Sequence, residues 1–103
     1  MPLPNGVCRL KLKWTRRALQ QLKEAQEYIS KDNPAAANDV AKHIAEATHL
    51  LLTQSQLGRT GRVKGTREWV VNKTPYLLAY TVENNTLQIL SVIHSKQNWP
   101  RSL

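Results

Sequence analysis

The stretch Gly58–Trp99 reads GRTGRVKGTREWVVNKTPYLLAYTVENNTLQILSVIHSKQNW, and it determines the fold. Its first residues are basic and rich in glycine, and three apolar segments follow at 67–71, 75–82 and 87–95. Alternating residues of high β propensity in these segments predict three strands. The sequence ENNT at 83–86 predicts a tight hairpin between the last two, because asparagine tolerates a positive φ. We therefore expect a three-stranded antiparallel meander.

The last of these strands is apolar on both faces, which indicates a central position in the sheet. Strict alternation places Leu87, Ile89, Ser91 and Ile93 on one face and Gln88, Leu90, Val92 and His94 on the other. In the first strand, the same rule places Trp69 and Val71 on a shared face.

Upstream of this stretch the sequence predicts one strand and two helices. Residues 7–14 alternate between apolar and mostly cationic side chains, the pattern of a half-buried strand. Apolar residues then recur at helical spacing over 16–31 and 34–54, with Thr15 and Asn33 as N-caps and Pro34 at the first helical position. The predicted fold class is α+β with the order β-α-α-β-β-β. An αα-hairpin packs on one face of the sheet, and the N-terminal strand joins at an edge or in the middle.

Length and charge restrict the possible functions. At 103 residues the chain is expected to form a single domain over 1–103, with 1–6 as a loose leader that lacks the pattern of a signal peptide. The net charge of +8 favours anionic partners such as nucleic acid, the ribosome or an acidic protein. The single cysteine, Cys8, excludes an intramolecular disulfide and fits a cytoplasmic location. No apolar run approaches the roughly 20 residues of a membrane span.

Four cations, Arg59, Arg62, Lys64 and Arg67, form a basic cluster between glycines. Arginine in a flexible backbone offers bidentate donors to phosphate or carboxylate, so this cluster predicts a phosphate- or target-binding site. The alternative is structural: Arg67 pairs with an acidic residue such as Glu68 or Glu46, and the other cations are solvated.

His94 is the residue best suited to general acid or base work near neutral pH. If the chain cleaves RNA, His94, Arg67 and Lys64 form the candidate catalytic set, with Arg62 adding positive charge. Lys96 and Trp99 extend the candidate target-binding surface, since an exposed indole can stack on a base. The alternative for His94 is a core or capping role. Trp14, Trp69 and Tyr80 are expected to be packing residues, and no metal site or cofactor is expected.

Three motifs resemble the toxins of the RelE/ParE superfamily of bacterial type II toxin–antitoxin modules. They are GxxGRxxGTRE at 58–68, PYxxxY at 75–80 and ILxVIHxxQxWP at 89–100, and the order of elements fits from about residue 10 to residue 100. RelE-like members are ribosome-dependent mRNA endonucleases (mRNA interferases), whereas ParE-like members share the fold and poison DNA gyrase. The resemblance also implies a cognate antitoxin, with a disordered segment that wraps the helical hairpin and covers the basic sheet.

The sequence departs from the RelE pattern at three places. Asn72 stands where RelE nucleases carry an arginine, Ser95 stands about where another arginine is expected, and Trp99 is the nearest aromatic to a missing C-terminal tyrosine. The signatures GTRExVV and VIH are closer to the ParE-like branch. The resemblance therefore implies a plasmid-stabilisation type of toxin that inhibits DNA gyrase, with a ribosome-dependent endonuclease as the alternative. A non-toxic basic module that binds RNA or protein is the third possibility.

Overall fold

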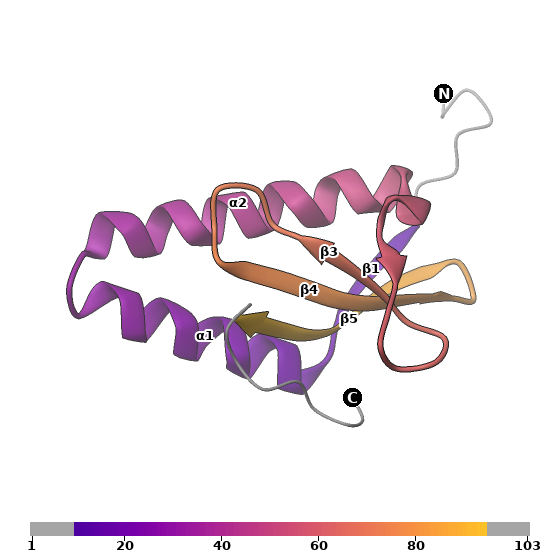
Figure 1. Ribbon diagram of the computed structural model, residues 1–103, viewed down its shortest axis with the longest axis horizontal. Coiled ribbons are helices and arrows are strands. Elements are labelled where there is room, and N and C mark those ends of the chain that lie inside the picture. The colour runs from indigo at the N-terminus through magenta and orange to yellow at the C-terminus, as the bar shows by residue number, and fades with distance from the viewer. Residues whose placement is uncertain (1–9, 95–103) are drawn as a thin grey trace.

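The computed structural model describes residues 10–94. Its elements are β1 (Lys11–Trp14), α1 (Arg16–Ser30), α2 (Pro34–Thr53), the 3-10 turn η2 (Ser55–Leu57), β2 (Arg59–Thr60), β3 (Arg67–Val70), β4 (Tyr76–Glu83) and β5 (Thr86–His94). The two helices lie antiparallel behind the sheet (Figure 1). None of the described helices is long and apolar enough to span a bilayer.

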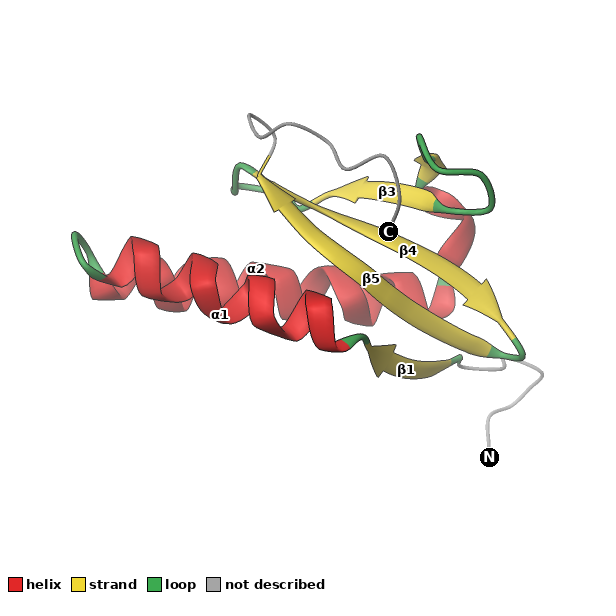
Figure 2. Cartoon of the chain, turned by 90° about the horizontal axis from the view of Figure 1, so that it is seen from below, coloured by secondary structure: helices red, strands yellow, loops and turns green. Residues whose placement is uncertain are grey.

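The five strands form one sheet in the order β1-β5-β4-β3-β2 (Figure 2). The helices cover one face, so the predicted α+β fold with a helical hairpin on one side is confirmed. The N-terminal strand lies at an edge and runs parallel to β5, with Leu12 opposite Leu87. The sheet is therefore mixed, and β5 is an interior strand between β1 and β4, as its apolar faces predicted.

Both helices begin where the capping residues predict. The Thr15 hydroxyl accepts a hydrogen bond from the Ala18 amide at 3.1 Å, and the Asn33 side chain accepts one from the Ala36 amide at 3.1 Å. Pro34 occupies the first turn of α2, where its missing N–H leaves no bond unmade. The Asn33 cap and Pro34 fix where α2 begins after the short turn, and hence the antiparallel hairpin.

The main core lies between the helices and the sheet. The side chains packed there are fully or largely buried: Ala18, Ala25, Val40, Ile44, Ala47, Leu51, Val71, Tyr76, Leu78, Tyr80, Leu87, Ile89 and Val92. Trp14 and Trp69 pack against this core while partly exposed, which confirms the packing role expected of both. A second cluster of Leu77, Ala79 and Ile93 lies on the opposite face of the sheet, because successive residues of β4 alternate between the faces.

A β-bulge in β5 changes the alternation predicted for this strand. Tyr80 pairs with Ile89 and Ala79 with Ser91, so Leu90 is an extra residue in the ladder. After it the faces exchange: Val92 joins Ile89 in the main core, and Ile93 lies in the cluster on the other face. The prediction of one continuous face through Ile93 was wrong, since strict alternation does not foresee an inserted residue.

One further difference concerns the loop before the first predicted strand of the meander. The 55–61 loop contains η2 and the two-residue strand β2, which pairs with β3. The sequence gives β2 no signal, because its two residues are polar and exposed. The predicted hairpin at 83–86 is confirmed, with φ of 52° at Asn84 and 59° at Asn85. The parts of the predicted first and last strands at 7–9 and at Ser95 lie outside the described residues.

Replacing Lys73 with glycine should stabilise the protein. Lys73 has a φ of 65° in the turn closed by the bond from the Thr74 amide to the Val71 carbonyl, and a lysine pays for this left-handed conformation. Glycine relieves that strain but adds chain entropy to the unfolded state. We expect a net gain of about 0.5 kcal/mol in the free energy of unfolding, measured by urea denaturation. Lys73→Ala keeps the Cβ and is the control; a gain there as large as with glycine would contradict the backbone explanation.

Candidate functional site

A buried carboxylate organises the basic cluster. Glu68 on β3 is only 4% exposed, and its carboxylate accepts a bond from the Arg59 guanidinium at 3.2 Å and from the Arg62 backbone amide at 3.0 Å. Arg59 lies on β2 and Arg62 follows that strand. The single side chain of Glu68 on β3 therefore holds both ends of the segment 59–62. The basic loop, defined as 59–67, is thus held in a defined shape by an acid at its base.

Arg67 and Tyr80 hold the segment 55–58, directly before the basic loop. The Arg67 guanidinium donates to the Gly58 carbonyl at 2.7 Å and to the Gln56 carbonyl at 3.4 Å. The buried Tyr80 hydroxyl donates to the Ser55 carbonyl at 2.6 Å and accepts from the Gly58 amide at 2.9 Å. Burial raises the pKa of Tyr80 above its ordinary value of 10.0, so the phenol keeps the proton that it donates. Its packing role is confirmed.

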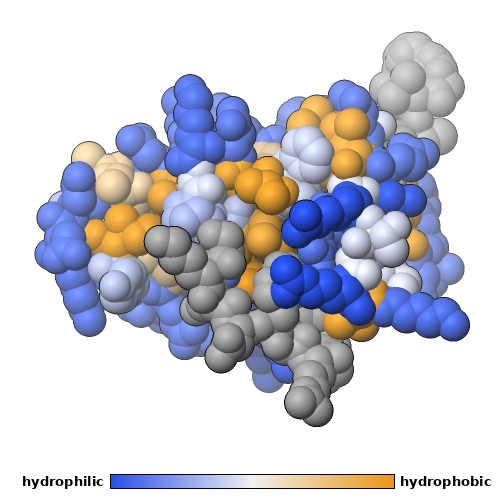
Figure 3. Space-filling model, viewed as in Figure 1, coloured by the Kyte–Doolittle hydropathy of each residue, from blue (hydrophilic) through white to orange (hydrophobic). Residues whose placement is uncertain are grey.

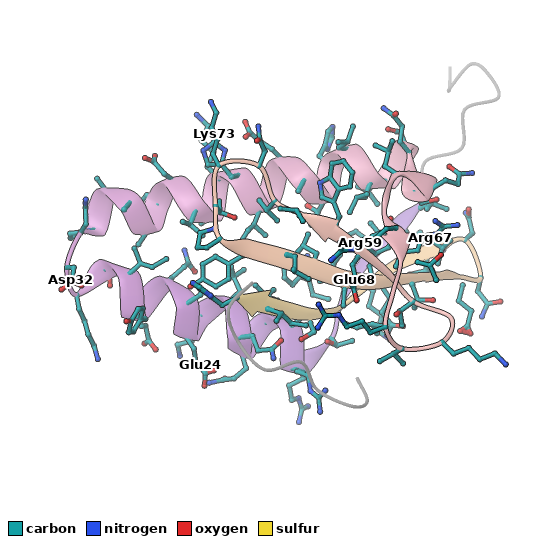
Figure 4. All side chains as sticks on the ribbon, viewed as in Figure 1. Glu24, Asp32, Arg59, Arg67, Glu68 and Lys73 are labelled. Atoms are coloured by element: carbon teal, nitrogen blue, oxygen red, sulfur yellow. The ribbon has the colours of Figure 1, made fainter. Side chains whose placement is uncertain are left out.

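The four cations of the cluster therefore differ in what they do. Figure 4 shows Arg59, Glu68 and Arg67 together at one end of the sheet. The ion pair proposed for Arg67 with Glu68 or Glu46 was wrong in its partner, since Glu68 pairs with Arg59 and Arg67 bonds carbonyl oxygens. Arg62 and Lys64 are exposed at the tip of the loop. On the face seen in Figure 3, strongly hydrophilic side chains gather over this end of the sheet, beside an apolar patch.

His94 lies at the other end of the sheet. It is paired with Tyr76 in the β4–β5 ladder, whereas Arg67 is paired with Tyr80 on the far side of β4. Four residues of strand separate these pairs by about 13 Å along β4. The Thr81 hydroxyl bonds the Gly65 carbonyl, which places the residue after Lys64 still farther along. The structure thus brings Arg59 and the Arg62 backbone to Glu68, with Arg67 the preceding residue of β3, and leaves His94 apart from them.

Around His94 the groups that could take part in chemistry are aromatic and acidic. The rings of His94 and Tyr76 meet edge to face, with centroids 5.2 Å apart and planes at 85°. Both rings line a hollow of about 490 Å³ that α1 bounds with Glu24 and Tyr28. Among residues 10–94, no group of three His, Cys, Asp or Glu side chains is placed to hold a metal ion. The target-binding candidates Lys96 and Trp99, like Cys8, lie outside the described residues.

The sequence did not reveal four of the residues that shape these sites. Glu68 was considered only as a partner of Arg67, although an acid inside a basic loop is itself a sign of a structural anchor. Gly58 was assigned only to a loop end, and the contact it makes with Tyr80 joins residues 22 positions apart. Glu24 and Tyr28, four residues apart on α1, share a face by helical periodicity, but nothing local places His94 beside them.

Comparison with known proteins agrees with the fold and with the motifs. The family described as "ParE toxin of type II toxin-antitoxin system, parDE" matches residues 12–99. The Sinorhizobium fredii protein named "Putative toxin Y4kP" is 41% identical over 97 residues, which cover 94% of this chain and 100% of that protein.

Two solved structures are also similar. A chain of the chromosomal ParDE toxin–antitoxin system from P. aeruginosa superposes with a TM-score of 0.75 and 26% identity, covering 84% of this chain and 96% of that one. A chain of the RelBE2 toxin–antitoxin complex from Mycobacterium tuberculosis shares the fold, with a TM-score of 0.55 and 21% identity over 87% of this chain and 95% of that one. With a family match across 88 of its 103 positions, from residue 12 to residue 99, this chain belongs to the ParE toxins of type II toxin–antitoxin systems.

Proposed function

We propose that this toxin arrests growth by poisoning DNA gyrase, and that the exposed tip of the basic loop, Arg62 and Lys64, belongs to the surface that meets gyrase or its DNA. The observation that carries the proposal is the distance between His94 and the basic loop. Cleavage of RNA by a histidine acid or base needs cations around the same phosphate, within hydrogen-bond reach. A spacing of about 13 Å along β4 favours a docking role for the loop over catalysis.

A cognate antitoxin is the second partner. The family is defined by toxin–antitoxin pairs, and the similar P. aeruginosa chain comes from a ParDE system. With a charge of +8, the toxin should attract acidic residues of the antitoxin to the basic loop. Exposed ion pairs are screened by salt, so the affinity of the complex should fall as ionic strength rises.

The alternative target is the ribosome. It is favoured by one observation: His94, Tyr76 and Glu24 converge on one hollow, where a histidine and a carboxylate could share acid and base roles. The two targets predict different damage. Induction of the toxin without antitoxin should yield cleaved or linearised plasmid while total mRNA stays intact. Rapid cleavage of translated mRNA with normal plasmid topology would overturn the gyrase proposal.

Two variants separate docking from catalysis. The double variant Arg62→Ala/Lys64→Ala should bind gyrase–DNA about tenfold more weakly, the effect of two contacts of roughly 0.7 kcal/mol each. His94→Ala should remain toxic. The matched control is Lys23→Ala/Lys42→Ala, which removes two exposed cations from the helices instead. If His94→Ala abolishes toxicity in a folded protein while the loop variant keeps it, the chain is a nuclease.

A further inference from the structure

A hollow of about 490 Å³ lies between α1 and the end of the sheet, away from the basic loop. Gln21, Glu24, Ala25 and Tyr28 of α1 form one wall, and Tyr76 and His94 of the paired strands form the other. Figure 4 shows Glu24 on α1, well separated from Arg59 and Arg67. The gyrase proposal gives this hollow no role.

The chemistry of the hollow suits a positive charge. Tyr28 and Tyr76 contribute aromatic rings, and an arginine or lysine head group is attracted to the face of such a ring. Glu24 adds a carboxylate, whose Oε2 atom accepts a bond from Gln20 at 3.2 Å. Burial and the neighbouring Tyr28 raise the pKa of Tyr76 above 10.0, so this ring also stays uncharged at neutral pH.

The charge of this region is opposite to that of the whole protein. The chain carries 15 lysines and arginines, yet none of the described residues that line the hollow is one of them, and Glu24 is the only carboxylate. A cation that would be repelled by most of the surface is therefore accepted here. The carboxamide oxygen of Gln21 is already engaged, since it accepts bonds from the Ser91 hydroxyl at 2.8 Å and the Val92 amide at 2.9 Å, which leaves Glu24 as the charged acceptor.

We infer that the hollow receives a single arginine or lysine side chain of the antitoxin, held between the tyrosines and Glu24. The inference rests on the proposed partnership with an antitoxin. An antitoxin segment must then place its acidic residues on the basic loop and its cation in this hollow at the far end of the sheet. Only one orientation of the segment satisfies both requirements. Opposite charges at two separated places thus fix the register of the bound chain and exclude antitoxins that lack the cation.

Calorimetric titration with the cognate antitoxin tests the inference. Glu24→Gln and Tyr28→Ala should each weaken binding by about tenfold, as expected for a partly desolvated cation–π contact with a carboxylate. Neither should disturb the fold, because Glu24 is exposed and Tyr28 is 72% exposed. The controls are Glu27→Gln, which removes one exposed charge from the same helix, and Leu19→Ala, which removes an exposed apolar side chain; both should bind as the wild type does.

Neutral substitution of each antitoxin arginine and lysine then identifies the cation. One of them should weaken binding to the wild type but not to Glu24→Gln, the sign of a direct coupling in a double-mutant cycle. Unchanged affinity of Glu24→Gln and Tyr28→Ala would overturn the inference, and so would a loss that couples to no antitoxin cation. A failure of the toxin–antitoxin proposal itself looks different, since the wild-type toxin would then not bind the antitoxin at all.

Discussion

Gly58→Ala should lower the free energy of unfolding by about 3 kcal/mol, from overpacking together with two weakened hydrogen bonds. Gly58 is buried, and a Cβ atom built there would clash with the Tyr80 hydroxyl and lie 2.8 Å from two carbons of its ring. Tyr80 cannot move aside, because it is fully buried and bonded to the Ser55 carbonyl. The backbone of Gly58 is extended, with φ of −67° and ψ of 142°, so alanine suffers no conformational strain and the effect is steric.

The sign of the change in unfolding free energy distinguishes a steric clash from an effect on the unfolded state. At a position of this backbone conformation without a close neighbour, alanine would stabilise the protein by about 0.4–1 kcal/mol through the unfolded state. Urea denaturation monitored by circular dichroism measures the difference. Tyr80→Phe is the companion variant: it leaves the Gly58 amide and the Ser55 carbonyl without the hydroxyl and should cost about 1–2 kcal/mol. Leu57→Ala, at an exposed neighbour, is the control and should change little. A Gly58→Ala protein as stable as the wild type would disprove the close packing described here.

Local signals predicted most of the fold and long-range contacts account for what they missed. The caps at Thr15 and Asn33, the ENNT hairpin and the apolar character of β5 are encoded within a few residues, and each was confirmed. The bulge at Leu90 depends on how β4 and β5 pair across the sheet. The attachment of β1 parallel to β5 joins segments about 75 positions apart, and no periodicity within either segment specifies it.

In the candidate site, too, the sequence predicted local features, whereas features that depend on long-range contacts were missed. The sequence grouped the basic residues because they are neighbours in the chain, and the packing role that it predicted for Tyr80 is confirmed. Some of these cations bond to other parts of the fold, and their partners are Glu68, Gly58 and Gln56. The register of β2 on β3 brings these partners to them. The separation of His94 from the loop likewise depends on strand register. A catalytic set combining His94, Arg67 and Lys64 stays a prediction, and the toxicity of His94→Ala decides it.

Glu68→Ala should destabilise the protein by about 2 kcal/mol. The substitution leaves the Arg62 amide without its acceptor and removes the partner of Arg59. Breaking a fully buried pair costs more, but the Arg59 side chain is 62% exposed and water replaces part of the lost interaction. Glu68→Gln keeps an acceptor and should lose about half as much. The control is Glu46→Ala, whose carboxylate meets His43 while 62% exposed and should contribute less than about 0.5 kcal/mol.

The same variant distinguishes a shaped site from simple charge attraction. Glu68→Ala raises the net charge from +8 to +9, so attraction between net charges alone predicts tighter binding to DNA or to an acidic antitoxin. If the basic loop must be held in shape, binding weakens instead, because freeing 59–67 adds an ordering cost to every contact. We expect the antitoxin affinity of Glu68→Ala to fall several-fold at a temperature where the variant is folded, with a smaller loss for Glu68→Gln. Tighter binding by the alanine variant would mean that the loop acts only through its charge, and that the buried carboxylate serves stability alone.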